Sequence, residues 1–425
     1  MKPIPKVTKY IVGVLCFLYA FLLPTQFGKH FWPEYTYLHG VKIDYLAPFI
    51  TTFDLVCLAL VMLNVFTYFK SQNDLRLQKI FKLGFPTILL LVFLIINIIF
   101  SFLPLVTLYK IAKMSLYFWT SYLIIKNYKS AEKSFFYGLF VGTMLVFVLA
   151  FWQFATKSSV GGIWYFLGER TITLSLPGIA KMSHEGKEFL RPYSTFSHPN
   201  SMGGFYLVLY FLCEFFTKNL YTTRLKFILA FTKLLSLFLI IISFSKVAIF
   251  AFVLISFVNV IRDKSYRECI LCFFARIAVF VFLLLFSFLF AGDPYTLDKR
   301  FFLITQSLEI LKNNLLFGVG FGASLVAQSK LAGAVPGRFT DTLQPAHNIY
   351  MLFASEIGIV GVALISYLIF INRKFFVRWQ KLPVAAISAI LITGFFDHYW
   401  LTLTQNIAML SLLIMTSIEI ARSKT

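Results

Sequence analysis

The sequence has little charge for its length. Only 13% of its 425 residues are Asp, Glu, Lys or Arg, whereas a typical soluble domain carries about 25%. Cysteine is also scarce, and all five cysteines lie in or beside hydrophobic stretches, which excludes a disulfide-stapled secreted fold. What is abundant is apolar: 59% of the chain is hydrophobic, including 52 phenylalanines. This composition predicts a polytopic membrane protein.

Several catalytic motifs are missing as well. The chain has no His-Glu-x-x-His and no closely spaced histidine pair, which argues against a zinc hydrolase. The predicted external loops contain no Asp-x-Asp, and no Gly-x-Ser-x-Gly occurs, which argues against a metal-dependent glycosyltransferase and a serine hydrolase. The lone Cys269-x-x-Cys272 has no second pair. The sequence therefore predicts no metal and no cofactor.

Apolar runs of roughly 20 residues, the length that crosses a bilayer as a helix, recur along the chain. They predict an all-α bundle of about twelve transmembrane helices in a single integral membrane domain, 1–425. The first run lacks a small-x-small cleavage site after it and is interpreted as a retained span. The predicted spans are 7–27, 48–69, 84–104, 105–125, 134–155, 201–217, 227–243, 245–261, 271–291, 348–371, 382–399 and 403–421.

Basic residues are distributed unevenly among the loops. With the N-terminus inside, short cytoplasmic segments hold more than half of the 39 Lys and Arg residues. The external loops hold fewer, spread over many more residues. The positive-inside rule then predicts that both termini are cytoplasmic. The net charge of +21 is explained by topology and requires no nucleic-acid partner.

Two long segments remain outside, about 156–200 and about 292–347, while every cytoplasmic loop is short. Long loops commonly carry function, so these two are predicted to form a cap over an active site at the outer face. The second opens with apolar residues spaced three and four apart, at Phe301, Ile304, Leu308, Leu311 and Leu315. That spacing predicts an amphipathic helix on the membrane or on the bundle.

The first long loop ends in a polar stretch, Arg191–Asn200, against the sixth predicted span. Its guanidinium, hydroxyls, the His198 imidazole and the Asn200 amide all stand at the mouth of the bundle. One interpretation is a binding site. The alternative is an arginine anchored at the membrane interface, followed by a turn rich in Pro, Ser and Asn.

The second long loop offers two more candidates. Arg300 precedes the amphipathic stripe, and the run Phe317–Gly322 then supplies Gly-x-Gly-x-Gly, whose N–H groups could hold phosphate or could simply form a returning loop. His347 and Asn348 stand where this loop re-enters the membrane. His347 is a candidate general base or an ordinary interfacial histidine. Glu356, nine residues on, is expected on the opposite helix face, in contact with another span.

Other charges lie at membrane depth and count as functional candidates by default. The alternative for each is snorkelling to the interface or pairing across helices. Cations outnumber acids in this set, as an anionic substrate requires. The residues are Asp54, Lys110, Lys113, Lys246, and Asp397 with His398.

Taken together, these segments resemble the O-antigen ligase and polymerase superfamily of bacterial membrane glycosyltransferases. The similarity covers roughly residues 190–410 and departs at Lys246, where many members have Arg after Ser. Its motifs are Arg191 with Ser194-Thr195-Phe196-Ser197-His198-Pro199-Asn200, Arg300 with Leu316–Gly322, His347-Asn348 with Glu356-Ile357-Gly358, and Phe396-Asp397-His398-Tyr399-Trp400 with Thr402.

The resemblance implies transfer of a glycan from an undecaprenyl-pyrophosphate donor to a glycan, lipid or protein acceptor, at the outer face of the cytoplasmic membrane among its lipids. It implies that Arg191, Arg300 and Lys246 bind the pyrophosphate and that His347 is the base, without a metal and with inversion. The expected supporting residues are His198, Asn200, Asn348, Glu356, Asp397 and His398.

Three alternatives to a ligase stay open at this point. Two belong to the same superfamily, a polymerase of repeat units and a protein O-glycosyltransferase. Some polymerases carry Arg followed eleven residues later by Gly in both long loops, and the absence of that pattern here favours a ligase. The third alternative is a flippase for a lipid-linked glycan, which would show related halves or a charged central cavity built from many spans.

Overall fold

The chain forms a mostly helical bundle in the computed structural model, which describes residues 6–71, 84–176, 178–185, 187–219, 222–262, 277–283, 285, 296–332, 343–372 and 382–422. The helices are α1 (Lys6–Leu22), α2 (Thr52–Ser71), α4 (Phe85–Ile99), α5 (Pro104–Tyr122), α6 (Glu132–Thr156), α7 (Pro199–Asn219), α8 (Thr223–Ile242), α9 (Lys246–Arg262), α11 (Thr296–Asn313), α12 (Ser324–Ala332), α14 (Ile349–Ile371), α15 (Val384–Gly394), α16 (Tyr399–Thr402) and α17 (Thr404–Arg422).

Each predicted span that is mostly described contains a helix, although the span 48–69 begins in an extended segment at Phe49–Thr51. Among the described residues, α6, α8, α14 and α17 are long and apolar enough to cross a membrane, and α1, α2, α4 and α15 contain shorter apolar helices. The predicted span 271–291 lies mostly outside the described residues. The count of twelve spans and the side of the membrane on which each loop lies stay predictions. A helix is confirmed over the predicted apolar stripe as α11, which ends at Asn313, before Leu315, and which leaves Phe301 and Leu308 exposed.

Two predicted spans are less regular than expected. The run 382–399 is not one helix, because α15 ends at Gly394 and a turn through Asp397 leads into the short α16. α14 contains a break at Gly358, whose φ of 65° lies outside the helical region. Both irregularities lie beside polar side chains, and both place loop-like backbone inside the bundle.

The predicted helical class is confirmed in the main, and three small two-stranded antiparallel sheets occur beside the helices among the described residues. β1 (Gly28–His30) pairs with β4 (Phe49–Thr51), and β2 (Tyr37–Leu38) pairs with β3 (Val41–Lys42), all between α1 and α2. β5 (Lys181–His184) pairs with β6 (Lys187–Leu190) in the first predicted external loop. Short one-turn segments complete the chain: η1 (Glu34–Thr36), η2 (Leu123–Asn127), η3 (Lys129–Ala131) and η4 (Gly162–Leu167).

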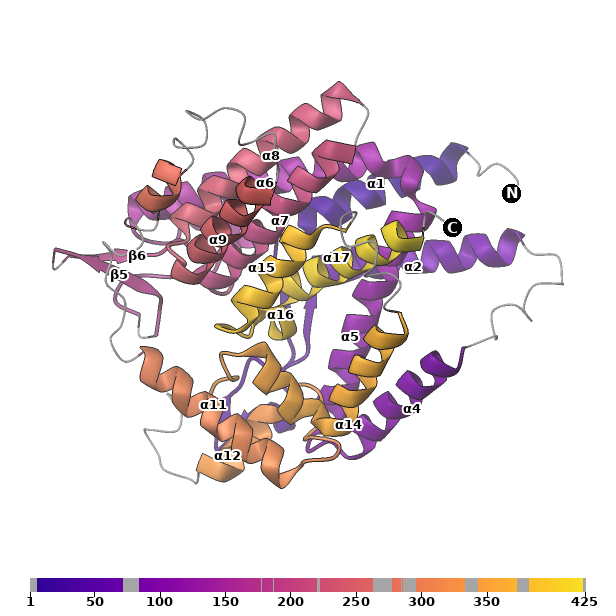
Figure 1. Ribbon diagram of the computed structural model, residues 1–425, viewed down its shortest axis with the longest axis vertical. Helices are drawn as coiled ribbons and strands as arrows, with labels where there is room; N and C mark the ends of the chain where they lie inside the picture. The colour runs from indigo at the N-terminus through magenta and orange to yellow at the C-terminus, as the bar shows by residue number, and fades with distance from the viewer. Residues whose placement is uncertain are drawn as a thin grey trace.

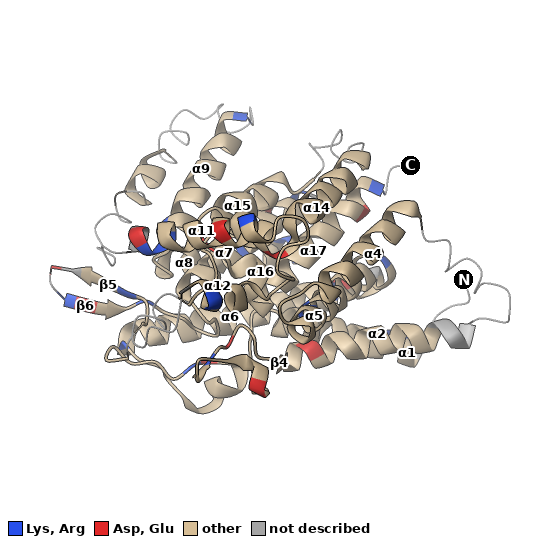
Figure 2. Cartoon of the chain, turned by 90° about the horizontal axis from the view of Figure 1, so that it is seen from below, with Lys and Arg blue, Asp and Glu red and all other residues tan. Residues whose placement is uncertain are grey.

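α7 lies at the centre of the bundle, where it packs against α8, α9, α15 and α17 (Figure 1). The largest apolar cluster surrounds it and includes the fully buried rings of Tyr19, Phe205, Tyr206 and Trp400. In Figure 1 the β5–β6 hairpin projects from the end of the molecule opposite the start of α1 and the end of α17. Charged residues fall mainly at helix ends and in loops, while the middles of most helices carry none (Figure 2).

Candidate active site

His347 and Asp397 meet where α14 begins and where α15 turns into α16. The Asn348 side chain caps α14 by accepting the N–H groups of Tyr350 and Met351, each at 3.0 Å. Its amide also donates to the Phe395 carbonyl at 3.2 Å, which ties the helix start to the turn. Nδ1 of His347 consequently lies 3.4 Å from Oδ1 of Asp397. This is an ion-pair distance without hydrogen-bond geometry, since Nδ1 has no hydrogen-bond partner.

A chain of polar contacts connects this pair to the first long loop. Asp397 accepts the Asn200 amide at 3.1 Å through Oδ2 and the His398 N–H at 2.9 Å through Oδ1. Asn200 in turn accepts Nη2 of Arg191 at 2.6 Å. The sequence motifs around residues 200, 347 and 397, far apart in the chain, therefore form one network.

The two arginines of this region differ in their bonding. Arg191 donates Nε and Nη2 to the Ser243 carbonyl at 3.1 and 3.0 Å, so one edge of its guanidinium is fixed to the turn before α9. Arg300, in the first turns of α11, keeps a buried Nε without a partner in the described part of the chain. It lies near enough for its charge to act on Arg191, His198 and His398. A buried donor without an acceptor is costly, so this Nε is free to donate to an anionic group that enters the site.

Burial and neighbouring charges set the protonation states of this network. Burial, reinforced by the Arg191 charge, lowers the pKa of His198 to about 3, and burial with the His347 charge lowers that of His398 to about 3. Burial would raise the pKa of Asp397, but contact with His347 and the charges of His398 and His198 hold it well below its usual value. At neutral pH the site therefore contains one carboxylate and at least two neutral imidazoles.

Arg191 keeps its charge despite its surroundings. Burial lowers its pKa to about 10, opposed by the nearby Tyr193 and Asp397. The guanidinium is therefore cationic at neutral pH. Together with Arg300 it makes this part of the site positive around a single carboxylate.

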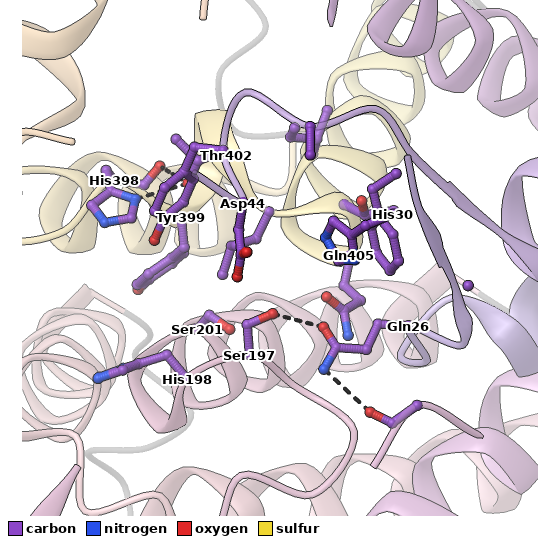
Figure 3. Close-up of a pocket in the computed structure, with 18 of the residues that line it drawn as sticks. Gln26, His30, Asp44, Ser197, His198, Ser201, His398, Tyr399, Thr402 and Gln405 are labelled. Carbon is purple, nitrogen blue, oxygen red and sulfur yellow. Dashed lines mark hydrogen bonds between the residues drawn. The ribbon is translucent and has the colours of Figure 1, made fainter. Parts of the chain in front are cut away.

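A cavity of about 690 Å³ opens onto this network. His198, His347, Asp397 and His398 line one end of it. Figure 3 shows His198, Ser197 and Ser201 on one wall and His398, Tyr399 and Thr402 on the wall facing it. Arg191, Arg300 and Lys246 do not line it among the described residues, and Lys246 is exposed at the first position of α9.

The other end of the cavity is built from residues that the sequence did not single out as a site. His30 and Asp44 come from the segment between α1 and α2, and Arg170 follows η4. His30 stacks on Phe49, with ring centroids 4.1 Å apart. Apart from two lysines, the sequence signal for this wall was the aromatic and basic character of residues 29–49. Lys110 and Lys113, predicted as membrane-depth cations, complete it.

The glycine run is not a phosphate cradle. Val319 and Gly320 donate their N–H groups to the carbonyls of Ser355 and Glu356 at 3.1 and 3.0 Å, and Phe321 donates to Oδ1 of Asn97 at 3.0 Å. Gly322 donates to the Glu356 carboxylate. These N–H groups are therefore already hydrogen-bonded, and the glycine run packs against α14 at the break near Gly358.

Glycine is required where the backbone of the glycine run approaches the backbone of α14. Gly318 and Gly358 both have positive φ, and a β-carbon at either would collide with the backbone of the other segment. Glu356 accepts the Ser324 hydroxyl at 2.8 Å. It makes no contact with His347, as its nine-residue separation predicted. Asn97, which the sequence analysis missed inside an apolar run, joins the segments by donating to the Phe317 and Glu356 carbonyls.

The side chains at the His347 end of the cavity could also bind a metal ion. His347, Asp397 and His398 each offer one ligand-type atom, and these atoms lie within 4.8 Å of one another. Nδ1 of His398 is engaged with the Thr402 hydroxyl at 2.8 Å. The spacing suits proton transfer between the groups and would also admit a divalent cation, so chelation is an informative test.

Comparison with known families supports the motif analysis. Residues 231–366, from within α8 to within α14, match the family model described as O-Antigen ligase. The resemblance to the O-antigen ligase superfamily is thereby confirmed. The matched stretch contains Lys246, Arg300, the glycine run and His347, while Arg191 and Asp397 lie outside it. No curated protein matches the chain.

Proposed function

We propose that this protein, whose residues 231–366 match the O-antigen ligase family, is a membrane glycosyltransferase of the ligase type. It moves a glycan from an undecaprenyl-pyrophosphate carrier to an acceptor at the outer face of the cytoplasmic membrane. The observation that carries this proposal is the His347–Asp397 pair at the wall of a large cavity, beside two arginines.

His347 acts as the general base. Its Nδ1 faces the Asp397 carboxylate, which leaves Nε2 as the nitrogen for an acceptor hydroxyl. A carboxylate beside the imidazole orients the ring and stabilises the imidazolium that forms. The His347 side chain is 23% exposed, so a hydroxyl in the cavity can reach it. Asn200, Asn348, His198 and His398 hold this pair in place, and Glu356 fixes the start of α14 from the other side.

Arg191, Arg300 and Lys246 bind the pyrophosphate. Arg191 has Nη1 remaining after its bonds to Ser243 and Asn200, and Arg300 has its unpartnered Nε. In the step, the acceptor oxygen bonds to the anomeric carbon while the bond from that carbon to the phosphate oxygen breaks. The proton passes to His347, and the pyrophosphate leaves with the electron pair. Fixed cations stabilise this charge without a metal, and direct displacement inverts the anomeric centre.

The alternative functions would either use the same site with a different acceptor or use the cavity for transport. A polymerase or a protein O-glycosyltransferase would differ only in the acceptor. A flippase would need no general base, and the gathering of polar groups from loops and turns around His347 favours chemistry over transport. Membrane lipids are the remaining partners, and nucleic acid has no role.

Transfer in proteoliposomes tests the proposal. Purified protein, a lipid-linked glycan donor and candidate acceptors should yield glycosylated acceptor and free undecaprenyl pyrophosphate, in the presence of EDTA as in its absence. Loss of transfer with EDTA and recovery with a divalent cation would contradict the metal-independent step. In cells, deletion of the gene should accumulate full-length lipid-linked polymer. Accumulation of single repeats would instead indicate a polymerase.

A further inference from the structure

Two lysines lie one helical turn apart on α5 and line the same cavity, but their bonding differs. Lys113 is held by the Asp54 carboxylate at 3.1 Å, the Phe49 carbonyl at 2.5 Å and the Tyr109 hydroxyl at 3.2 Å. The Lys110 ammonium has no hydrogen bond and no ion pair within the described parts of the chain. Lys113 is therefore explained as a structural ion pair, and Lys110 is not.

The surroundings of Lys110 hold its side chain along the cavity wall. A β-carbon at position 322 would lie only 2.9 Å from Cγ of Lys110, so the glycine run packs directly on its aliphatic stem. Glu356 is the acidic group whose charge acts on Lys110. That carboxylate is already occupied by the Ser324 hydroxyl and by backbone N–H groups. A shielded cation without a contacting anion is unfavourable unless a ligand supplies one.

The cavity has two charged ends. At one end, the charges of Arg191 and Arg300 act on His198, and that of Arg300 also acts on His398. At the other end, Asp44, Arg170, Lys113 and Lys110 act on His30. A transferase has to hold two substrates at once, and the arginines stand on the side assigned to the donor. The Lys110 end is left for the second substrate.

We propose that Lys110 binds an anionic group, a phosphate or a carboxylate, on the acceptor glycan or lipid, and so selects an acidic acceptor. The inference rests on the proposed function. Lys110 acts in binding, with His347 supplying the chemistry. Arg170 also lines the cavity, donates to the Ser197 carbonyl at 3.4 Å and adds its charge to that acting on His30.

Measuring the KM of the acceptor and that of the donor separately tests whether Lys110 binds the acceptor. With Lys110→Met, the KM for a phosphorylated acceptor should rise about tenfold or more, while the donor KM and kcat change less than about twofold. Lys110→Arg should recover most of the loss. Lys113→Met is the matched control, and it should lower Tm through loss of its ion pair with Asp54. An unchanged acceptor KM, or a rise in the donor KM instead, would overturn the proposal.

A binding measurement separates this inference from the proposed function. Detergent-solubilised protein should gain more thermal stability from glucosamine 1-phosphate than from glucosamine. Lys110→Met should lose that difference, and Arg300→Met should keep most of it. If wild-type protein transfers nothing yet phosphate binding depends on Lys110, the proposed function fails and the anion site stands. If the stabilisation by phosphate is the same with and without Lys110, the anion site fails.

Discussion

Two buried carboxylates of this protein sit in very different surroundings. Glu356, 4% exposed, is itself hydrogen-bonded, and Ser324, Asn97 and the N–H groups of the glycine run around it all have partners, with Lys110 the exception among its described neighbours. Asp397, 7% exposed, lies beside an unbonded Nδ1 of His347, and the charge of Arg300, whose Nε is also unbonded among the described residues, acts on the adjacent His398. A completed polar network stabilises a fold, whereas an incomplete one is typical of a site that awaits substrate.

The largest expected effect in this comparison is the loss of transfer activity when His347 is replaced. His347→Ala should reduce transfer by about 10² to 10⁴-fold, because it removes the group assigned to accept the proton of the acceptor hydroxyl. The protein should keep its Tm within a few degrees. His39→Asn, at an exposed histidine with positive φ, is the control and should transfer normally. Normal transfer by His347→Ala in proteoliposomes would remove the assigned base.

Substitution of the carboxylate partner should have a smaller effect. Asp397→Asn keeps the shape of the side chain and one acceptor oxygen but removes the charge that stabilises the imidazolium. We expect kcat to fall by about one to two orders of magnitude. The donor KM should change little. A variant with full kcat would show that Asp397 only supports the turn between α15 and α16.

Removing a member of the hydrogen-bond network around Glu356 should lower the stability of the fold. Asn97→Ala leaves the Phe317 and Glu356 carbonyls and the Phe321 N–H without their buried partner. The free energy of unfolding should fall by about 2 to 4 kcal/mol. Asn372→Ala, at an exposed amide after α14, should cost under about 0.5 kcal/mol. If Asn97→Ala abolished transfer without lowering Tm, the two regions would not be separable in this way.

A further effect concerns the pH dependence of stability. His198 and His398 have a pKa of about 3 in the folded protein, so between about pH 6.5 and 3 only the unfolded chain binds protons there. The free energy of unfolding should therefore decrease on acidification, by up to about 1.4 kcal/mol per pH unit for each histidine. Asp397, with its lowered pKa, adds a further loss below about pH 4. Tm measured from pH 7 to 4 should fall less steeply in His398→Gln.

Local patterns were sufficient to predict the helices and the amphipathic α11, because hydrophobic spacing is written in neighbouring residues. The motifs predicted the superfamily, which the family match confirms. The roles assigned to His347 and the arginines remain predictions. The wall from residues 28–49, the Asn97 junction and the break at Gly358 depend on partners about forty or more residues away. No spacing rule at Asn97 shows that its amide will meet Glu356.

The turn between α4 and α5 docks onto the glycine run, with the Phe102 N–H donating to the Val319 carbonyl at 2.9 Å. The hydroxyls of Ser101 and Thr107 occupy the space where a side chain at position 320 would begin. Because Gly320 also has a φ of 95°, shrinking Ser101 would not make room for alanine there. Homologous sequences should therefore keep glycine at 320, and an alignment of relatives would show any variation at 101 without a matching change at 320.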